Sequence, residues 1–321
     1  MNTKIININS ETYSLNDAIV ALKNSDIVVF PTETVYGIGA NALDKNAVLK
    51  IFAVKNRPPD NPLIVHALSL DWIYEYSIVK EKSLLDELFA EFCPGPLTFI
   101  LDKKSIIPYE TTGGLESVAI RVPRHDVALR LIKEFGLPIS APSANISGRP
   151  SATSLDMLNE LNGKVPIIVY AGESQIGIES TVIDIRKFPP KVLRPGFVTV
   201  EELKKVTGRI EVAETSHISP GNKYKHYRIN IPVAVFSSID SAINFIDSKS
   251  FSKPFFISTK KIDKFEGYVF NSYLELSKIL YRMLYECEKK GYDIVFIEKP
   301  SDEGLGFSIL NRIKKTSDYY I

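Results

Sequence analysis

Residues 26–39 read DIVVFPTETVYGIG, which passes from an apolar run into hydroxyl side chains and glycines. The run at residues 26–30 predicts a buried strand that Pro31 ends, because proline lacks the backbone N–H of a sheet ladder. α/β sheets place ligands beyond the carboxyl ends of their strands, where glycine lets backbone N–H groups approach an anion. The stretch therefore indicates a ligand-binding turn, although a plain turn with glycine at positive φ is favoured when these residues are taken alone.

Strand-like and helix-like segments alternate through residues 1–215. Apolar runs predict strands at residues 26–30, 63–65, 97–101, 118–122, 166–170 and 181–185. Helical spacing predicts a helix at residues 46–55, with Val48, Leu49 and Phe52 on one face, and another at 126–135 that Gly136 closes. Residues 199–202 form a capping box that opens a further helix. This mixture favours an α/β or α+β layered domain.

The pattern changes after residue 215. Residues 216–232 are rich in Tyr, Lys, His, Pro and Gly and show neither period, which predicts a linker. Strands are then expected at residues 233–236, 255–257, 268–270 and 293–298, and helices at 241–247, 274–289 and 306–315. The alternation predicts a small, parallel, Rossmann-like domain over residues 233–321. No Gly-x-Gly-x-x-Gly turn follows its first strand, so no dinucleotide site is assigned.

Charge and composition narrow the possible partners. The 321 residues carry 39 Lys and Arg against 38 Asp and Glu, so the net charge is +1. Proteins that hold nucleic acid through its phosphates are usually far more basic, and we expect no stable nucleic-acid binding. Two cysteines are too few for a disulfide framework, and no run of about 18 apolar residues predicts a membrane span. A cytoplasmic protein without a membrane partner is the expectation.

Three cations lie in and just after the helix predicted at residues 46–55. Lys50 and Lys55 lie near the helix end, and Arg57 lies in the loop that follows, before a double proline. Arg57 can hold a phosphate or carboxylate through two parallel hydrogen bonds, whereas lysine acts as a point charge. Favourable charge at a helix C-terminus accounts for the two lysines equally well. His66 ends a buried strand, where a lone histidine is more often structural than catalytic.

Two further segments contain polar residues that point to a binding site. Arg121 lies inside an apolar strand, so it either points to solvent or meets an anion, because burying an unpaired charge costs several kcal/mol. Residues 138–151, PISAPSANISGRPS, form a stiff loop dense in hydroxyl groups. The sequence contains no Ser/His/Asp elbow, Cys/His pair or His-x-x-x-His spacing, so no protein metal site is expected. A site of Lys, Arg, Ser, Thr and Asn suits phosphate chemistry, in which the protein positions the reactants and neutralises charge.

Taken together, these motifs resemble those of the YrdC-like threonylcarbamoyl-adenylate synthases. The matching motifs, in family order, are PTETVYG at 31–37, KNRP at 55–58 with PL at 62–63, CPGPLT at 93–98, RVP at 121–123, APSANISG at 141–148, EST at 179–181 and LRPG at 193–196. The segments SPGNKYKHY at 219–227 and GLGFSILNR at 304–312 resemble the long, two-domain branch of the family. The resemblance thus covers nearly the whole chain.

The resemblance implies a twisted open sheet with a basic concave pocket in residues 1–215. It implies an enzyme that combines L-threonine, bicarbonate and ATP, with Mg²⁺ on the ATP phosphates, into threonylcarbamoyl-AMP and pyrophosphate. The product would feed the downstream machinery that transfers the threonylcarbamoyl group to adenosine in tRNA. Residues 216–232 would fold over the pocket as a lid.

The resemblance also assigns roles to individual residues. The catalytic cations would be Lys50, Lys55 and Arg57. The threonine site would comprise Thr32, Tyr36, His66, Arg121, Ser140, Ala141, Ser180 and Thr181, with Arg121 on the amino-acid carboxylate. The ATP site would comprise Lys55, Asn61, Ser117, Ser143, Asn145, Ser151, Arg194, Tyr227 and Asn230. The chain departs from the family pattern at Asn222 and at Arg228-Ile229.

Two other functions compete with this interpretation. A YrdC-like module could instead grip double-stranded RNA through its concave face, but the net charge of +1 and the small-ligand hydroxyl groups oppose that reading. A carbamoyl-transfer enzyme with the same domain would also carry zinc fingers, which two cysteines cannot supply.

Overall fold

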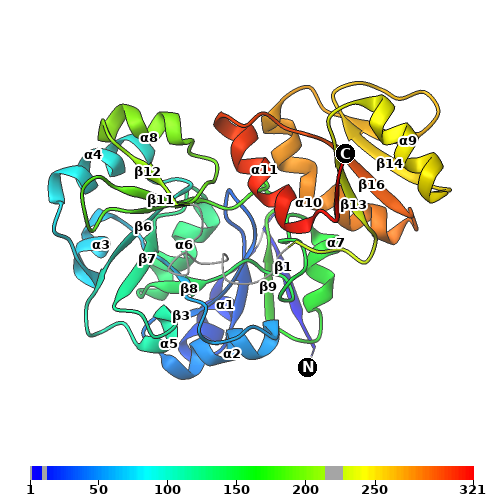
Figure 1. Cartoon of the computed structure of the whole chain (residues 1–321). Helices are drawn as coiled ribbons and strands as arrows, with labels where there is room; N and C mark the ends of the chain where they lie inside the picture. The colour runs from blue at the N-terminus through cyan, green and yellow to red at the C-terminus, as the bar shows by residue number, and fades with distance from the viewer. Residues whose placement is uncertain (1, 9–12, 214–226) are drawn as a thin grey trace. The chain divides into compact units, whose positions relative to one another are not determined.

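The computed structural model describes residues 2–8, 13–213 and 227–321, and these form two compact units (Figure 1). The first unit comprises Met1–Ser147 and Ser151–Tyr224, and the second comprises Gly148–Pro150 and Lys225–Ile321. Most of the predicted linker falls outside the described residues. Within the described ranges, no helix is both long enough and apolar enough to cross a membrane.

The first unit is built on one mixed sheet, confirming the predicted α/β class. Its strands run in the order β1-β9-β2-β3-β8-β4-β7-β6-β10-β11-β12, and β5 pairs with β6. The strand bounds are β1 (Lys4–Asn7), β2 (Val28–Phe30), β3 (Gly37–Asn41), β4 (Ile64–His66), β5 (Ser77–Ile78), β6 (Leu97–Lys103), β7 (Ser117–Arg121), β8 (Ile139–Ala141), β9 (Ile167–Tyr170), β10 (Thr181–Asp184), β11 (Lys191–Arg194) and β12 (Glu211–Val212).

Helices pack on this sheet around two apolar clusters. One cluster joins the sheet to α3 (Leu70–Tyr76), α4 (Lys82–Phe92) and α8 (Val200–Thr207), and the other joins it to α1 (Asn16–Lys23) and α6 (Asp126–Phe135). The remaining helical segments are α2 (Lys45–Lys55), α5 (Tyr109–Thr112), α7 (Leu155–Leu158) and the 3₁₀ turn η1 (Asn159–Leu161).

Local sequence explains several of these boundaries. Helix α6 has the predicted bounds, and it ends at Gly136, whose φ of 82° is a left-handed conformation that favours glycine. The capping box predicted at Thr199 is formed with Glu202 and opens α8. The predicted apolar face of α2 is wrong at Leu49, which is 43% exposed, because the buried face runs through Val48, Phe52 and Lys55 instead.

Close packing at β3 explains one glycine of the opening motif. A Cβ atom at Gly39 would lie 2.6 Å from Ile139 Cγ2 and 2.7 Å from Phe30 Cε1. Any larger residue would therefore push β2 or β8 away from β3. The close approach matters for function, because β3 lies between β2 and β8 in the sheet. It therefore sets the spacing between the turn after β2 and the polar loop after β8.

The second unit is the predicted small Rossmann-like domain. Its strands are β13 (Val233–Phe236), β14 (Pro254–Ser258), β15 (Glu266–Val269), β16 (Ile294–Glu298) and β17 (Tyr319–Tyr320), and all pairs are parallel in the order β15-β14-β16-β13-β17. Its helices are α9 (Ile239–Lys249), α10 (Tyr273–Lys289) and α11 (Gly304–Thr316). The short strand β17 was not predicted.

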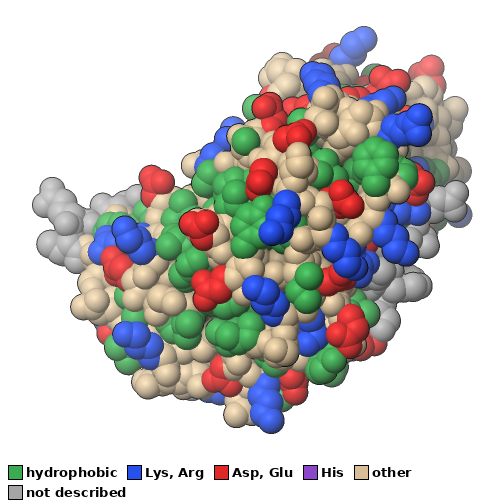
Figure 2. Space-filling view, turned by 90° about the vertical axis from the view of Figure 1, so that its left-hand side faces the viewer, with side chains coloured by type: hydrophobic (Ala, Val, Ile, Leu, Met, Phe, Trp, Pro, Cys, Tyr) green, Lys and Arg blue, Asp and Glu red, His purple; other side chains and the backbone are tan. Residues whose placement is uncertain are grey.

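Surface charge agrees with the near-zero net charge. Figure 2 shows basic and acidic side chains interspersed over the face that it draws, with apolar side chains scattered among them. The larger concentrations of buried polar groups lie in the first unit, where three arginines, two glutamates, a lysine and a histidine are buried together with hydroxyl groups.

Candidate functional site

The segment between β2 and β3 forms a buried turn held by its own hydroxyl groups. Thr32 Oγ1 donates to the carbonyl oxygen of Val35 over 2.6 Å and lies 2.9 Å from Thr34 Oγ1. Thr32 and Thr34 are only 3% and 1% exposed. A turn follows β2, as predicted, and its hydroxyl groups are turned inward at the carboxyl end of this strand. The prediction of glycine at positive φ is wrong, because Gly37 and Gly39 lie in β3 with ordinary backbone angles.

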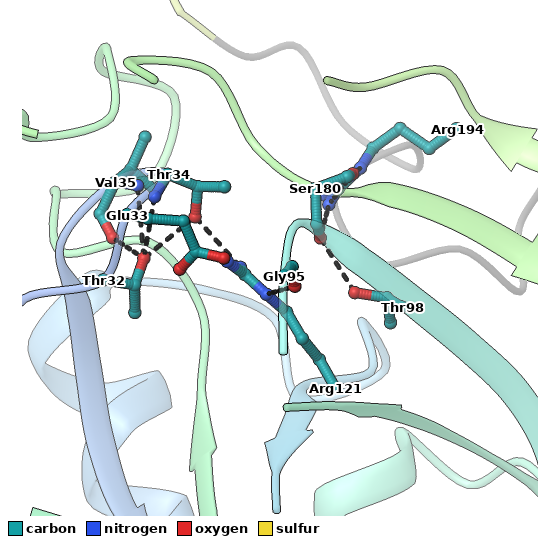
Figure 3. A network of polar contacts seen from close by, with 9 residues as sticks. All are labelled: Thr32, Glu33, Thr34, Val35, Gly95, Thr98, Arg121, Ser180 and Arg194. Carbon is teal, nitrogen blue, oxygen red and sulfur yellow. Dashed lines mark hydrogen bonds and ion pairs between the residues drawn. The ribbon is translucent and has the colours of Figure 1, made fainter. Parts of the chain in front are cut away.

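Arg121, at the end of β7, reaches this turn, as Figure 3 shows. Its Nε donates to the carbonyl oxygen of Gly95 over 3.1 Å, its Nη1 donates to Thr34 Oγ1 over 2.9 Å, and its Nη2 lies 2.7 Å from Glu33 Oε1. The side chain is 3% exposed. Arg121 was expected either to point to solvent or to meet an anion, and it meets an anion. That anion is a carboxylate of the protein itself.

His66 lies beside Arg121 because β4 and β7 pair in parallel with these two residues in register. The imidazole ring meets Phe30 edge-on, with ring centroids 5.7 Å apart. Burial, together with the positive charge of Arg121, lowers the pKa of His66 to about 3. The ring is therefore neutral at physiological pH, and its Nδ1 has no hydrogen-bond partner among the described residues.

Lys55 ends α2 and points at the polar loop after β8. Its Nζ donates to the carbonyl oxygens of Ser143 and Asn145 and lies 3.4 Å from Asn145 Oδ1, which also accepts from Ser143 Oγ over 2.6 Å. Burial and the nearby Arg57 lower the pKa of Lys55. The three oxygen acceptors favour the ammonium form, because a neutral amine has only two N–H groups to donate.

The two other predicted catalytic cations lie apart from these contacts. Arg57 Nη2 donates to the carbonyl oxygens of Asn61 and Pro62, over 3.2 and 3.0 Å, so it braces the loop that leads into β4. Lys50 lies on the exposed side of α2, where its Nζ is 3.4 Å from Asp26 Oδ1. The structure therefore brings Lys55, but not Lys50, to the polar loop.

A second buried network joins β6, β10 and β11. Ser180 Oγ lies 2.8 Å from Thr98 Oγ1 and accepts from Arg194 Nη2 over 3.2 Å, and the carbonyl oxygen of Ser180 accepts from Arg194 Nε and Nη2 (Figure 3). Nearby in sequence, Ser151 Oγ donates to Glu179 Oε1 over 2.6 Å. These contacts hold Arg194 at the end of β11.

The other predicted residues occupy several positions. Tyr36 donates its hydroxyl to the carbonyl oxygen of Gly172, and Thr181 Oγ1 donates to that of Val198. The sheet register places further predicted residues on or beside the central strands, all of them buried: Asn61, Ser117, Ser140 and Ala141. Within the second unit, the Tyr227 ring stacks on Tyr281 at 4.9 Å, and Asn230 binds Glu288.

Sequence reasoning missed three polar residues of these networks: Glu33, Thr34 and Thr98. Each is at most 1% exposed. Glu33 stood inside the quoted motif, and the signal that could have identified it was the buried Arg121, which requires a counter-ion. Among the described residues, no cluster of three or more His, Cys, Asp or Glu side chains could hold a metal ion.

Family models match both units. A model described as "Telomere recombination", for the Sua5, YciO and YrdC proteins, matches residues 20–196. A second model, described as "Threonylcarbamoyl-AMP synthase, C-terminal domain", matches residues 198–317. Together the two models account for most of the chain.

Full-length relatives carry one name. The chain is 39% identical to the threonylcarbamoyl-AMP synthase of Pyrococcus abyssi over 99% of both chains. It is 36% identical to that of Bacillus subtilis, over 96% of this chain and 95% of the relative. Among solved structures, P. abyssi Sua5 complexed with L-threonine matches with a TM-score of 0.92 and 37% identity, covering 99% of this chain and all of that one.

Proposed function

The chain belongs to the family of threonylcarbamoyl-AMP synthases, and from that membership we propose how its residues make the product. The reaction joins L-threonine, bicarbonate and ATP into threonylcarbamoyl-AMP, and it releases pyrophosphate and water. Threonine supplies the amine that bonds to the carbonate carbon, and the carbamate oxygen then replaces pyrophosphate on the α-phosphorus of ATP. The product serves threonylcarbamoyladenosine modification of tRNA, through a downstream transfer machinery.

Two buried cations in the first unit, Arg121 and Lys55, have different hydrogen-bond partners, and this supports a division between an amino-acid site and a nucleotide site. The amino-acid site is centred on Arg121, with Thr32 and the neutral His66 beside it. The nucleotide site is centred on Lys55 and the polar loop at Ser143 and Asn145. The single observation that carries the assignment is this separation, because a carboxylate and a polyphosphate each need their own positive charge.

In this scheme the protein contributes positioning and charge neutralisation rather than a nucleophile. Arg121 would hold the threonine carboxylate, and Thr181, Ser180, Ser140, Ala141 and Tyr36 would complete that site. Arg194, Ser151, Asn61 and Ser117 would hold ATP with the polar loop, and Arg57 would keep the loop before β4 in shape. Mg²⁺ would arrive on the ATP phosphates and neutralise the leaving pyrophosphate.

The linker at residues 216–232 is proposed as a lid. Its tyrosines and basic residues could cover a nucleotide by stacking and by neutralising phosphate, which a pure Gly/Ser spacer could not do. The mixed-anhydride product hydrolyses easily, so exclusion of water has a clear use. Tyr227 and Asn230, at the end of this segment, are proposed to approach the nucleotide when the lid is closed.

Pyrophosphate release tests the proposed function. The purified protein is incubated with ATP and Mg²⁺, and threonine and bicarbonate are added separately and together. We expect release only when both are present, because the carbamate that attacks ATP needs both. Release that is equally fast with serine in place of threonine, or in bicarbonate-free buffer, would remove the case for this substrate pair.

A further inference from the structure

Glu33 is the most deeply buried carboxylate near the amino-acid site. Its side chain is 0% exposed, and its Oε1 lies 2.7 Å from Arg121 Nη2. Burial acts to raise the pKa of Glu33. The positive charge of Arg121 and nearby backbone N–H groups lower it by more than burial raises it, so the pKa lies below its ordinary value. Glu33 is therefore a carboxylate anion at neutral pH, enclosed within the first unit.

The contact between Glu33 and Arg121 is a close ion pair between two buried side chains. The carboxylate is also stabilised by the backbone N–H of Arg124. The other two nitrogens of Arg121 are committed, Nε to Gly95 and Nη1 to Thr34 (Figure 3). The guanidinium is thus fixed at two corners by hydrogen bonds and neutralised at the third by the carboxylate of Glu33.

We propose that Glu33 is the specificity-determining counter-ion of Arg121, which holds the guanidinium in place and cancels its charge, so that a zwitterionic amino acid binds there in preference to a bare anion. This inference rests on the proposed role of Arg121 in binding the threonine carboxylate. A buried guanidinium without a counter-ion would attract any small anion from solution. With Glu33 present, the pair carries no net charge, and a ligand gains little from its own net negative charge.

Threonine and 3-hydroxybutyrate form a matched pair of probes. They share the carboxylate and the hydroxyl group, but only threonine carries an ammonium group, so threonine has no net charge and 3-hydroxybutyrate has a charge of −1. Removing one negative charge near Arg121 should strengthen binding of the anion. It should strengthen the binding of threonine less, because the threonine carboxylate is freed from a repulsion while the threonine ammonium group loses an attraction. At separations near 6 Å and an effective dielectric constant near 20, this difference is roughly 10- to 100-fold in affinity.

The test measures the Kd of both probes by calorimetry in the full-length protein and in Glu33→Gln. Glutamine keeps the size of the side chain and removes its charge. The Kd ratio of 3-hydroxybutyrate to threonine should fall about 10- to 100-fold in Glu33→Gln, while the ATP Kd stays within about twofold. The matched control is Glu91→Gln, which removes the same charge from the exposed face of α4 and should leave the ratio unchanged.

Glu33→Asp separates charge from position. It keeps the charge but shortens the reach to Arg121, so threonine should bind more weakly while the Kd ratio stays within about threefold of the wild-type value. An unchanged ratio in Glu33→Gln, or an equal fall of the ratio in Glu33→Asp and Glu33→Gln, overturns the proposal.

The wild-type protein provides a further test, which can overturn the proposal even where Glu33→Gln does not fold. Its affinity for 3-hydroxybutyrate must be at least about tenfold weaker than for threonine. Equal affinities would overturn the role of Glu33. These binding measurements stand apart from catalysis, so a protein that binds threonine selectively but releases no pyrophosphate would contradict the proposed function and not this inference.

Discussion

Replacing Lys55 with methionine should destabilise the first unit strongly. Lys55 is 2% exposed, and its Nζ is the donor for the carbonyl oxygens of Ser143 and Asn145. Methionine fills nearly the same space but donates nothing, so the buried carbonyl group of Asn145 and the partly buried one of Ser143 lose this donor. Each buried acceptor left unsatisfied costs about 1–3 kcal/mol.

An opposing effect reduces the expected loss. Burial lowers the pKa of Lys55, which means that holding the ammonium group in the interior is itself unfavourable, and the methionine variant is relieved of this. Relief is only partial, because the carbonyl groups that solvate the ammonium stay behind. We therefore expect the free energy of unfolding to fall by about 2–4 kcal/mol. The backbone bond from Ser147 N to the Lys55 carbonyl oxygen, 2.8 Å long, remains and limits the disturbance.

Urea unfolding followed by the fluorescence of Trp72 measures this loss. Trp72 is the only tryptophan, and it packs against both apolar clusters of the first unit, so its signal reports that unit rather than the C-terminal one. The matched control is Lys50→Met in the same helix. The Lys50 side chain is 46% exposed and pairs with Asp26, so its loss should cost less than about 1 kcal/mol.

Activity adds a second outcome to the same pair of variants. Under conditions where Lys55→Met is folded, ATP-dependent pyrophosphate release should fall, because the loop at Ser143 and Asn145 has lost its anchor. Lys50→Met tests the sequence-based prediction that Lys50 takes part in catalysis. Equal destabilisation of the two variants, or a loss below about 1 kcal/mol for Lys55→Met, would refute the reasoning about the buried donor.

Three further predictions concern the rest of the first unit. Arg121→Lys should weaken threonine binding about 10- to 150-fold and leave ATP binding within about twofold, and calorimetry showing equal losses would contradict this. Because the pKa of His66 falls from 6.5 to about 3 on folding, its contribution to stability is complete above pH 6.5 and is lost as the pH falls towards 3. The free energy of unfolding, measured by urea titration at several pH values in this range, should depend less steeply on pH in His66→Gln. A chain truncated after Ala213 should stay folded and bind threonine but make little product, and full turnover would rule out the lid.

Sequence periodicity predicted the elements whose signals are local. The bounds of α6 follow from its apolar spacing and from Gly136, and the start of α8 follows from the capping box at Thr199. Leu49 was misplaced because a single extra apolar residue beside a helical stripe does not reveal where the stripe ends. The strand β17 was missed because two exposed tyrosines carry no alternation that can be read.

The candidate site was harder to predict, because its contacts depend on strand register. Within the first unit, β3 and β8 pair Ala40 with Ser140, and β4 and β7 pair His66 with Arg121. Partners so far apart in the sequence leave no periodic trace. The family resemblance supplied the residues that would touch ligands, but not the residues that hold them, such as Thr98 behind Ser180 and Arg194.

The Arg121 example shows what physical reasoning from a sequence can reach. An arginine in an apolar strand implies a counter-ion, since an unpaired buried charge costs several kcal/mol. A ligand carboxylate could be that counter-ion only while bound, whereas the empty protein must fold and persist without it. A carboxylate of the protein itself is therefore required in addition, and the buried Glu33 meets that requirement. In the scheme that we propose, the two anions would have different tasks: Glu33 would neutralise Arg121 in the empty protein, and the substrate carboxylate would bind the same guanidinium.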